Sequence, residues 1–156
     1  ALYDRLSPYE MVKYFADLNG MDKGVFDDRC KKIFKQLNMD SFSNKRIGTL
    51  SSGMKQKTSI ARTIIHDPDI IVFDEPTTGL DVMTSRAIIE LIRNSKEDKK
   101  TIIFSSHRME EVQSLADDIG VIYNGKIIFC DSKENFESQM ESNSYDDNLI
   151  KMISSA

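Results

Sequence analysis

The sequence is poor in the residues that build covalent or metal-bound frameworks. Only two of its 156 residues are cysteines, Cys30 and Cys130, and they lie in unrelated segments without a C-x-x-C spacing. Cysteines placed in this way predict neither a disulfide framework nor a zinc site. We therefore expect a protein of a reducing, cytosolic compartment.

Two further absences limit the classes of partner. Basic residues are not in excess, because 21 Lys and Arg stand against 25 Asp and Glu and the formal net charge is -4. This balance provides no positive field for a nucleic-acid backbone, so no nucleic-acid partner is expected. No apolar run approaches the roughly 18 residues of a membrane-spanning helix, and no signal-peptide pattern opens the chain. Any role at a membrane is expected to be peripheral, through a partner.

The chain does contain enough apolar side chains, 40% of its residues, to form a packed core. Its first half has helical periodicity, and residues 7–10, Ser-Pro-Tyr-Glu, match a capping box that predicts a helix ending near Gly20. A second helix, expected to pair antiparallel with the first, is predicted by apolar residues at helical spacing: Val25, Phe26, Cys30, Ile33, Phe34 and Leu37. A third helix is predicted to begin at Ser51 or Ser52 and to stop before Pro68.

The second half of the chain changes to the pattern of buried strands. Residues 70–73, Ile-Ile-Val-Phe, and 101–104, Thr-Ile-Ile-Phe, are continuous apolar runs, which are typical of strands buried on both faces. A helix capped by Asp81 lies between them, so the strands are expected to be parallel and joined by a right-handed crossover. After a further helix through residues 109–116, the dipeptide Asn124-Gly125 between two apolar runs predicts a tight hairpin.

Two acidic side chains, Asp74 and Glu75, directly follow the first of these strands. The carboxyl ends of the strands are where ligands bind in an open parallel sheet. One carboxylate there can hold Mg²⁺, while its neighbour orients and deprotonates a water for phosphoryl transfer. The alternative is a surface acidic pair in the turn before Pro76.

The two histidines receive different interpretations. His107 follows the second strand, where it can bond a terminal phosphate and stabilise the charge that develops during transfer. The alternative for His107 is a helix-start residue or a histidine packed on the surface. His66, near the end of a helix, is interpreted as a cation close to a helix C-terminus.

The segment 50–57, Leu-Ser-Ser-Gly-Met-Lys-Gln-Lys, places small residues and a glycine at a helix N-terminus. The free amides and the helix dipole at such a terminus favour an anion such as phosphate. The alternative is an ordinary serine cap with surface lysines.

The order of these segments closely resembles that of the ABC ATPases. In chain order, 50–57 matches the family's signature, 70–76 its Walker B strand, 77–81 (Thr-Thr-Gly-Leu-Asp) its D-loop and 106–107 (Ser-His) its switch histidine. The resemblance extends from the first residues to about Asp131. It implies an α/β fold of the P-loop NTPase (RecA-like) type, with a partial parallel sheet and an inserted α-helical subdomain.

The resemblance also implies a role for each matching residue. Asp74 matches the Mg²⁺-site aspartate, Glu75 the catalytic base and His107 the switch histidine. Contacts to ATP are implied for residues of the signature and the D-loop: Ser51, Ser52, Gly53, Met54 and Asp81. Two nucleotide sites form between two ATPase subunits in this family. Ser51 and Gly53 are therefore expected to contact the γ-phosphate bound by the opposing subunit.

Two departures from the family pattern are mild. Ser52 stands where the commonest signature has glycine, and Met54 replaces its glutamine. Both changes occur among the sodium-efflux and other drug- or ion-export ATPases that this sequence looks like.

A larger departure is the absence of a P-loop, G-x-x-x-x-G-K-[ST], between a strand and a helix. Residues 120–126 match G-x-x-x-x-G-K, but Ile127 stands where a hydroxyl should bind Mg²⁺, and a hairpin is predicted there. Family members carry the P-loop upstream, followed by a glutamine loop, and residues 1–6 look like the exit of that loop. The chain is therefore expected to be a C-terminal part of a longer subunit and inactive alone.

Three parts of the chain are expected. These are an ABC helical, signature-bearing subdomain at 1–66, the C-terminal half of a RecA-like nucleotide-binding core at 67–131, and a polar tail at 132–156. The residues expected to anchor the tail are Phe136, Met140, Leu149, Ile150 and Ile153. A sheet without the strands of the P-loop part is expected to expose an edge, which favours dimerisation or poor solubility.

The function implied by the resemblance is that of the ATP-binding and ATP-hydrolysing subunit of an ABC membrane exporter for an ion or a drug. Its expected cofactors are ATP and Mg²⁺, and its expected partners are a second ATPase subunit and a transmembrane permease. Through the permease it is expected at the cytoplasmic face of the cell membrane. Two alternatives stay open, a soluble ABC ATPase of translation or chromosome maintenance and a non-catalytic interaction fragment. Against the former, its relatives usually show glutamate and lysine after the signature glycine.

Overall fold

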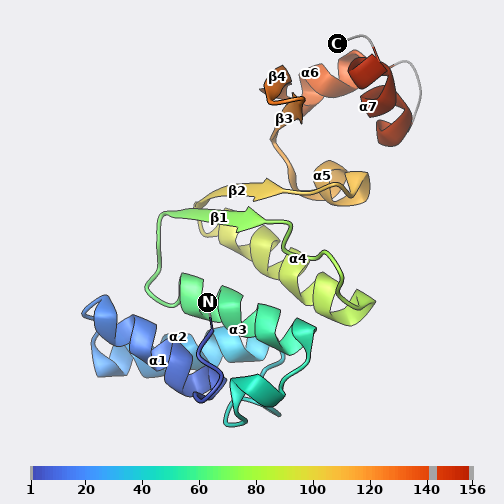
Figure 1. Cartoon of the computed structure of the whole chain (residues 1–156). Coiled ribbons are helices and arrows are strands. Elements are labelled where there is room, and N and C mark those ends of the chain that lie inside the picture. The colour runs from blue at the N-terminus through green and yellow to red at the C-terminus, as the bar shows by residue number, and fades with distance from the viewer. Residues whose placement is uncertain (1, 141–143, 155–156) are drawn as a thin grey trace. The chain divides into compact units, whose positions relative to one another are not determined.

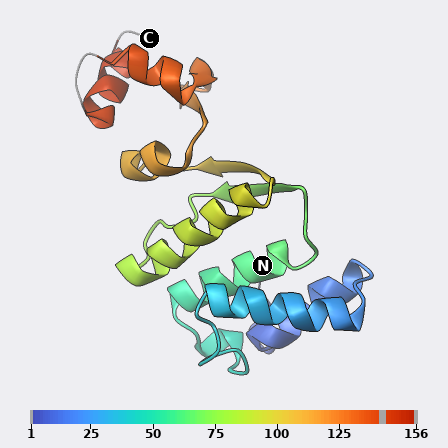
Figure 2. The same cartoon turned by 180° about the vertical axis from the view of Figure 1, so that it is seen from behind.

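The computed structural model describes residues 2–140 and 144–154, and its chain divides into two compact units (Figures 1 and 2). The first unit spans Ala1–Ser105 and the second spans Ser106–Ala156. Ala1, which opens the segment interpreted as a glutamine-loop exit, lies outside the described residues.

Three α-helices form the N-terminal part of the first unit: α1 (Pro8–Leu18), α2 (Lys23–Gln36) and α3 (Ser52–Ile64). The capping box predicted at the start of α1 is confirmed. The Ser7 hydroxyl accepts a hydrogen bond from the Glu10 amide, and the Glu10 carboxylate accepts one from the Ser7 amide. The helix stops before Gly20, as the sequence predicts. A short 3-10 helix, η1 (Ile47–Thr49), precedes α3, whose N-cap is Ser51.

The core of this helical part lies where α1 packs against α3 and α2 packs against both. Side chains without exposed surface in this core include Met11, Val12, Leu37, Met39, Ile47 and Ile65. Burial of one such side chain contributes about 1.5–3 kcal/mol. Ring contacts also join the helices: the Arg62 guanidinium of α3 lies 5.0 Å from the centre of the Phe15 ring on α1. Tyr9 on α1 and Phe26 on α2 form an edge-to-face contact, with 5.6 Å between the ring centres.

The rest of the first unit consists of β1 (Ile70–Asp74), α4 (Val82–Glu97) and β2 (Thr101–Ser105). The two strands are parallel, as predicted, and their register pairs Ile70 with Thr101 and Asp74 with Ser105. Asp81 caps α4, as predicted, because its carboxylate accepts a hydrogen bond from the Thr84 amide. The helix covers one face of the strand pair (Figures 1 and 2).

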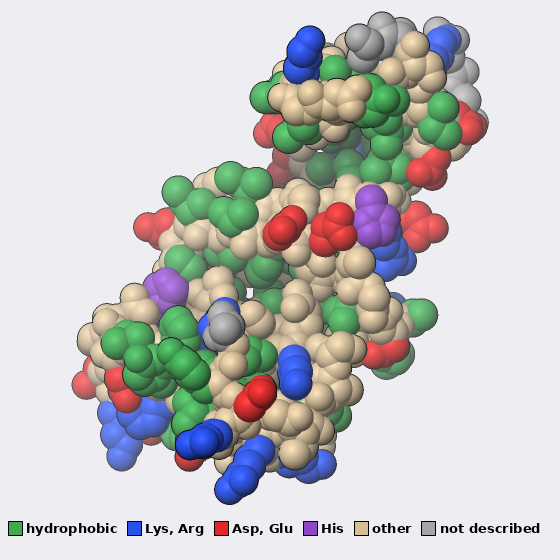
Figure 3. All heavy atoms as spheres, in the orientation of Figure 1, with side chains coloured by type: hydrophobic (Ala, Val, Ile, Leu, Met, Phe, Trp, Pro, Cys, Tyr) green, Lys and Arg blue, Asp and Glu red, His purple; other side chains and the backbone are tan. Residues whose placement is uncertain are grey.

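The expectation that these strands are buried on both faces is wrong for this structure. Ile70, Val72 and Ile103 are 63%, 64% and 57% exposed, whereas Ile71 and Phe73 are buried. Hydrophobic side chains gather over the strands in the space-filling view (Figure 3). Successive side chains of a strand point to opposite faces, and α4 covers one face of this pair. A continuous apolar run therefore indicates a strand with two apolar faces. In this structure, only the face toward α4 is covered.

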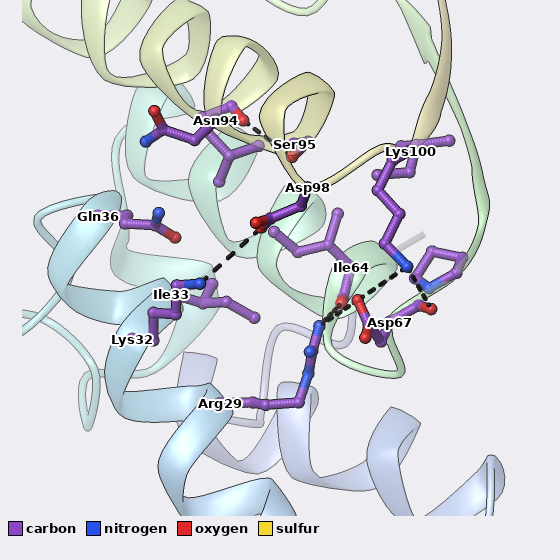
Figure 4. Close-up of a pocket in the computed structure, with 13 residues that line it drawn as sticks. Arg29, Lys32, Ile33, Gln36, Ile64, Asp67, Asn94, Ser95, Asp98 and Lys100 are labelled. Carbon is purple, nitrogen blue, oxygen red and sulfur yellow. Dashed lines mark hydrogen bonds and ion pairs between the residues drawn. The ribbon is translucent and has the colours of Figure 1, made fainter.

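A cluster of charged side chains joins α2 to the turns that follow α3 and α4 (Figure 4). Arg29 on α2 donates to the carbonyl oxygens of Ile64 at 3.2 Å and Ile65 at 2.8 Å, at the C-terminal end of α3. Its guanidinium also lies 3.0 Å from Asp67 Oδ1, and the ammonium of Lys100 lies 3.2 Å from the same oxygen. These contacts border a cavity of about 70 Å³. They hold the helical part of the first unit to its strand-bearing part.

The second unit contains α5 (Met109–Leu115), β3 (Asp118–Tyr123), β4 (Lys126–Ser132), α6 (Lys133–Ser138) and α7 (Tyr145–Ser154). β3 and β4 form an antiparallel hairpin. Asn124 and Gly125 at its turn have φ of 48° and 74°. Two consecutive positive φ values are typical of the tight turn that the Asn-Gly dipeptide predicts, so the hairpin prediction is confirmed.

The core of the second unit is a small cluster built around Phe136 and Tyr145, which are 2% and 6% exposed. Met140 and Leu149 pack against it, as the sequence predicts, but Ile150 is 61% exposed and does not. Tyr145 was not expected to take part, because a lone tyrosine among polar residues gives no periodic signal. The division of the chain at residues 66 and 131 stays a prediction.

The helices differ in length but remain short. The longest helix in the described ranges is α4, with 16 residues. A transmembrane helix needs about 20 consecutive, mostly apolar residues. Within residues 2–140 and 144–154, no helix combines the length and the apolar character needed to cross a membrane.

Candidate functional site

The carboxylates predicted to act on phosphate lie where the parallel strands end. Asp74 is the last residue of β1 and stands opposite Ser105, the last residue of β2. The Ser105 hydroxyl donates to Asp74 Oδ1 at 2.7 Å and accepts from the Glu75 amide at 2.9 Å. Both Asp74 and Glu75 are exposed. A ligand can therefore reach both carboxylates at this edge of the sheet, which is where open parallel sheets bind their ligands.

Glu75 has an unusual backbone conformation, with φ at 42°. Non-glycine residues rarely occupy this left-handed region, and doing so costs on the order of 1–3 kcal/mol. The Thr78 hydroxyl donates to Glu75 Oε2 at 3.0 Å, and the Thr78 amide donates to the Glu75 carbonyl at 3.3 Å. Such strained residues cluster at functional sites when their surroundings hold them in place. Strain beside a second carboxylate therefore makes Glu75 a functional candidate.

A recess of about 250 Å³ opens beside Asp74, between α3 and β1. It is lined by Gln56, Ser59, Ile60, Thr63, Val72, Phe73, Asp74 and Pro76. The side-chain amide of Gln56 donates from Nε2 to the Pro76 carbonyl at 3.3 Å. This bond ties α3, at whose start the predicted signature residues lie, to the turn that follows the carboxylates.

The four predicted signature residues form the N-terminus of α3. Ser51 is the N-cap, and its hydroxyl accepts a hydrogen bond from the Met54 amide at 3.3 Å. Ser52 is the first residue of the helix and Gly53 is the second. The cap bond is what an ordinary serine cap also provides. The helix terminus nevertheless supplies the amides and the positive end of a dipole that fit an anion.

Gly53 brings the start of α3 close to the start of α4. A Cβ atom at Gly53 would lie 3.4 Å from the Thr84 side chain and 3.7 Å from Asp81 Oδ2. The hydrogen bond from the Thr84 amide holds the pKa of Asp81 below its ordinary value. Lys57 on α3 is 9% exposed; burial lowers its pKa, and the charge of Asp81 acts in the opposite direction. The structure thus places the residues predicted to form the signature beside those predicted to form the D-loop, within the first unit.

His107 belongs to the second unit and lies just before α5. Its two neighbours in sequence are tied to one carboxylate: Ser106 donates to Glu111 Oε2 at 2.8 Å, and Arg108 pairs with Glu111 Oε1 at 3.0 Å. Glu111 is 3% exposed, whereas His107 is exposed. A buried carboxylate therefore anchors the loop from which His107 projects.

Residues 120–126, which match part of the P-loop pattern, lie in a hairpin. Gly120 is in β3, Lys126 opens β4, and the turn between them has no helix after it. A P-loop leads from a strand into a helix, whose N-terminus meets the phosphates. The interpretation of this match as a hairpin and not a phosphate loop is confirmed.

The donor groups fit a nucleotide with its metal ion. Mg²⁺ in nucleotide sites is commonly held by one or two carboxylates together with waters and phosphate oxygens. Asp74 offers an exposed carboxylate of this type at the strand end. In the described part of the chain, no three His, Cys, Asp or Glu side chains gather as a metal site. A single carboxylate such as Asp74 fits Mg²⁺ binding in which phosphate oxygens and water supply the other ligands.

Three contacting residues were not singled out by sequence reasoning: Ser105, Thr78 and Glu111. The signal for Ser105 was available, because two apolar runs of equal length paired in parallel place it opposite Asp74. Glu111 follows His107 by four residues, one helical turn, which is a weaker signal. Thr78 lay inside the D-loop match without any feature that indicates its bond to Glu75.

Known proteins similar to this chain are ABC transporter components. Residues 3–78 match the family model described as ABC transporter. The chain is 45% identical over 139 residues to the ABC transporter ATP-binding protein NatA of Bacillus subtilis (strain 168), covering 88% of this chain and 56% of NatA. It is 31% identical to the linearmycin resistance ATP-binding protein LnrL of the same organism, covering 90% of this chain and 45% of LnrL. It is 35% identical to the lantibiotic transport ATP-binding protein SrtF of Streptococcus pyogenes, covering 87% of this chain and 59% of SrtF.

A solved structure described as the ATP binding subunit of an ABC transporter has the same fold. The TM-score is 0.88 at 21% identity, with 97% of this chain and 64% of that chain covered. This likeness confirms the predicted α/β fold class, with parallel strands and helices of the P-loop NTPase type. The chain spans about half the length of the curated relatives it matches. By sequence, it belongs to the ABC transporter ATP-binding family, as a homologue of NatA and other ABC ATP-binding proteins.

Proposed function

We propose that this chain forms part of the ATP-hydrolysing subunit of an ABC membrane exporter. The observation that carries the proposal is the pair at the end of β1, where Asp74 is followed by the strained Glu75 and both are held by Ser105. Asp74 binds the Mg²⁺ that neutralises charge on the phosphates of ATP. Glu75 orients the attacking water and takes its proton.

The remaining phosphate contacts are assigned to a P-loop in a longer subunit. The family relatives extend well beyond the matched region, since this chain covers 56% of NatA and 45% of LnrL. P-loop amides and the P-loop lysine position the γ-phosphate and stabilise its charge. The full-length subunit, meaning a protein in which a P-loop segment precedes this chain, is therefore the proposed ATPase. The 156-residue chain alone is proposed to be inactive.

The two faces of the nucleotide site come from two copies of the subunit. His107 and Glu75 act on the ATP bound by their own subunit. The N-terminus of α3, with Ser51 and Gly53, meets the γ-phosphate of ATP in the opposing subunit, where its amides and dipole favour the anion. The closeness of Gly53 to Asp81 supports the assignment of the D-loop to the same interface. Ser52 and Met54 complete this terminus, within a helical subdomain proposed to span residues 1–66.

The transported substrate is proposed to be an ion or a drug, and the partner a transmembrane permease at the cytoplasmic face of the membrane. Support comes from the resemblance of the signature segment to those of sodium-efflux and drug-export ATPases. Two relatives are named for linearmycin resistance and for lantibiotic transport. These names favour a transporter over a soluble ABC protein of translation or chromosome maintenance.

The Glu75→Gln variant of the full-length subunit tests this function. Its ATP affinity is expected to stay within a few-fold of wild type, because the phosphate contacts remain. Steady-state hydrolysis is expected to fall by roughly three orders of magnitude, because the base is lost. Nucleotide titration and phosphate release measure the two quantities.

Glu90→Gln on α4 is the matched control, since it removes an exposed carboxylate of the same unit that lies 3.7 Å from Arg86. This control is expected to hydrolyse ATP at the wild-type rate. The 156-residue chain alone is expected to be no faster than its own Glu75→Gln variant. Unchanged turnover in the full-length Glu75→Gln variant would show that Glu75 is an acidic turn residue without a catalytic role.

A further inference from the structure

One serine at the end of β2 contacts both carboxylate-bearing residues at the end of β1. The Ser105 hydroxyl lies 2.7 Å from Asp74 Oδ1 and 2.9 Å from the Glu75 amide nitrogen. A hydroxyl carries a single hydrogen and the Glu75 amide is a donor. Ser105 therefore donates to Asp74 and accepts from Glu75. A change of Ser105 to alanine removes both bonds at once.

We propose that Ser105 is a positioning residue that sets the geometry of Asp74 and Glu75 for ATP hydrolysis. The inference rests on the proposed function, and it concerns a residue to which the family resemblance gives no role. Its bond to Oδ1 fixes the rotation of the Asp74 carboxylate, the group that binds Mg²⁺. Its bond to the amide holds the backbone from which the Glu75 side chain extends.

The left-handed backbone at Glu75 explains why the second bond matters. A glutamate at φ 42° stays there when neighbouring contacts hold it, since more favourable conformations are available. Thr78 holds Glu75 from the following turn, and Ser105 holds it from the adjacent strand. Loss of the contact to β2 weakens this restraint and lets φ relax. The direction of the Glu75 carboxylate then changes with the backbone.

The sheet itself places Ser105 where this bridge is needed. Asp74 and Ser105 form the last residue pair of the parallel register, so the bridge lies at the edge where the strands end. A threonine keeps the hydroxyl and is well tolerated in strands. Alanine keeps the strand and removes the hydroxyl. The Ser105→Thr and Ser105→Ala variants therefore separate the hydroxyl from the rest of the side chain.

The test compares Ser105→Ala, Ser105→Thr and Ser95→Ala in the full-length subunit. Ser95 is the matched control, because its hydroxyl on α4 donates to the Leu91 carbonyl at 2.9 Å, away from the carboxylates. Three readouts are measured: kcat and KM for ATP, the Mg²⁺ concentration that half-saturates binding of a non-hydrolysable ATP analogue, and hydrogen exchange of the Glu75 amide without nucleotide. The last two do not depend on turnover.

At saturating Mg²⁺, Ser105→Ala is expected to lower kcat about tenfold with KM for ATP within about twofold of wild type, because the two carboxylates are misplaced while the other contacts to ATP remain. The half-saturating Mg²⁺ concentration should rise several-fold, and the Glu75 amide should exchange faster. Ser105→Thr should restore all three readouts, and Ser95→Ala should change none of them.

Two results would overturn the inference. One is wild-type kcat and Mg²⁺ dependence in Ser105→Ala, and the other is the same loss in Ser105→Thr as in Ser105→Ala. Both leave the proposed function standing if wild-type hydrolysis still depends on Glu75. Hydrolysis that is independent of Glu75 would overturn the proposed function and this inference together.

Discussion

Tyr145 shows, at the scale of a single residue, how burial controls ionisation. Its ring packs against Phe136 with 5.3 Å between ring centres, and its hydroxyl donates to the carboxylate of Glu137. Burial and the negative charge of Glu137 raise the pKa of Tyr145 to about 12. Both effects disfavour the phenolate.

The raised pKa predicts a loss of stability at alkaline pH. In the unfolded chain a tyrosine ionises near pH 10. Because the folded pKa is higher, the contribution of Tyr145 is fully present below pH 10 and is lost as the pH rises through about 12. Urea unfolding of the 156-residue chain between pH 9 and 12 measures this slope, and tyrosinate absorbance follows the ionisation.

Two variants isolate the contribution of Tyr145. Tyr145→Phe should lose the absorbance step near pH 12 and flatten the pH dependence of stability. Tyr123→Phe, at a residue that is 38% exposed, should keep both. An absorbance step near pH 12 that survives in Tyr145→Phe would contradict the assignment.

Residue-scale chemistry was only partly readable from the sequence. The residue types and positions of the acidic pair at 74 and 75 and of the serine cap at 51 are enough to predict their places. The structure confirms that they lie at a strand end and at a helix start. The position of Ser105 opposite Asp74 follows from the sequence only when the two apolar runs are also paired in register, and its two hydrogen bonds are seen only in the structure. The left-handed φ of Glu75 was not visible either, since nothing in its side chain favours that region.

Arg29 links α2 to the C-terminal end of α3 and to the turns that follow α3 and α4. It donates to the carbonyls of Ile64 and Ile65 at the end of α3 and pairs with Asp67, which also meets Lys100 after α4. A cation at a helix C-terminus satisfies carbonyls that lack helical partners and complements the dipole. Burial acts to raise the pKa of Asp67, but the hydrogen bond from Lys100 and the two positive charges lower it overall.

Arg29→Met is therefore expected to destabilise the chain by about 1–3 kcal/mol, because it removes charged hydrogen bonds to partly buried carbonyls as well as an ion pair. The urea midpoint measures the change. Lys13→Met is the matched control, since Lys13 pairs at 2.7 Å with Asp17 on the exposed side of α1. That control should change stability by less than about 0.5 kcal/mol.

The Arg29 cluster also predicts a dependence on acid. Because the folded pKa of Asp67 is lowered, its contribution to stability is present above the ordinary pKa of about 4 and is lost as the pH falls through the lower folded value. Arg29→Met should weaken this acid dependence as well as the stability at pH 7. Equal stability of Arg29→Met and wild type would show that α2 and α3 are held by apolar packing alone.

Elements were the most predictable level of this molecule, because their signals are local. The capping box at Ser7, the cap at Asp81 and the Asn-Gly turn each specify a boundary within a few residues, and all three appear where expected. The burial of β1 and β2 was not predictable, because it depends on how many layers cover the strands. Val72 is apolar by sequence and 64% exposed in the structure.

At the scale of the whole molecule, the family and its fold class were recognisable because four short motifs occur in one order. Assembly is not determined by a single chain, because the proposed contact of Ser51 and Gly53 with ATP needs a second subunit. The chain contributes a helix N-terminus with Gly53 close to Asp81. Whether this terminus meets a phosphate across an interface is the central claim of the proposed function, and ATP-driven dimerisation reports on it.

The most direct measurement is the dimer mass of the Gly53→Asp variant of the full-length subunit by light scattering in ATP, in a Glu75→Gln background that holds the bound state. A carboxylate beside a phosphate in a partly desolvated interface costs on the order of several kcal/mol. The matched control is Gly24→Asp, which adds the same charge at the second residue of α2, after the N-cap Asp22. Gly53→Asp is expected to bind ATP within a few-fold of its parent but to stay monomeric, while Gly24→Asp is expected to dimerise. Normal dimerisation of Gly53→Asp in ATP would contradict the account and reduce the segment 50–57 to a capped helix with surface lysines.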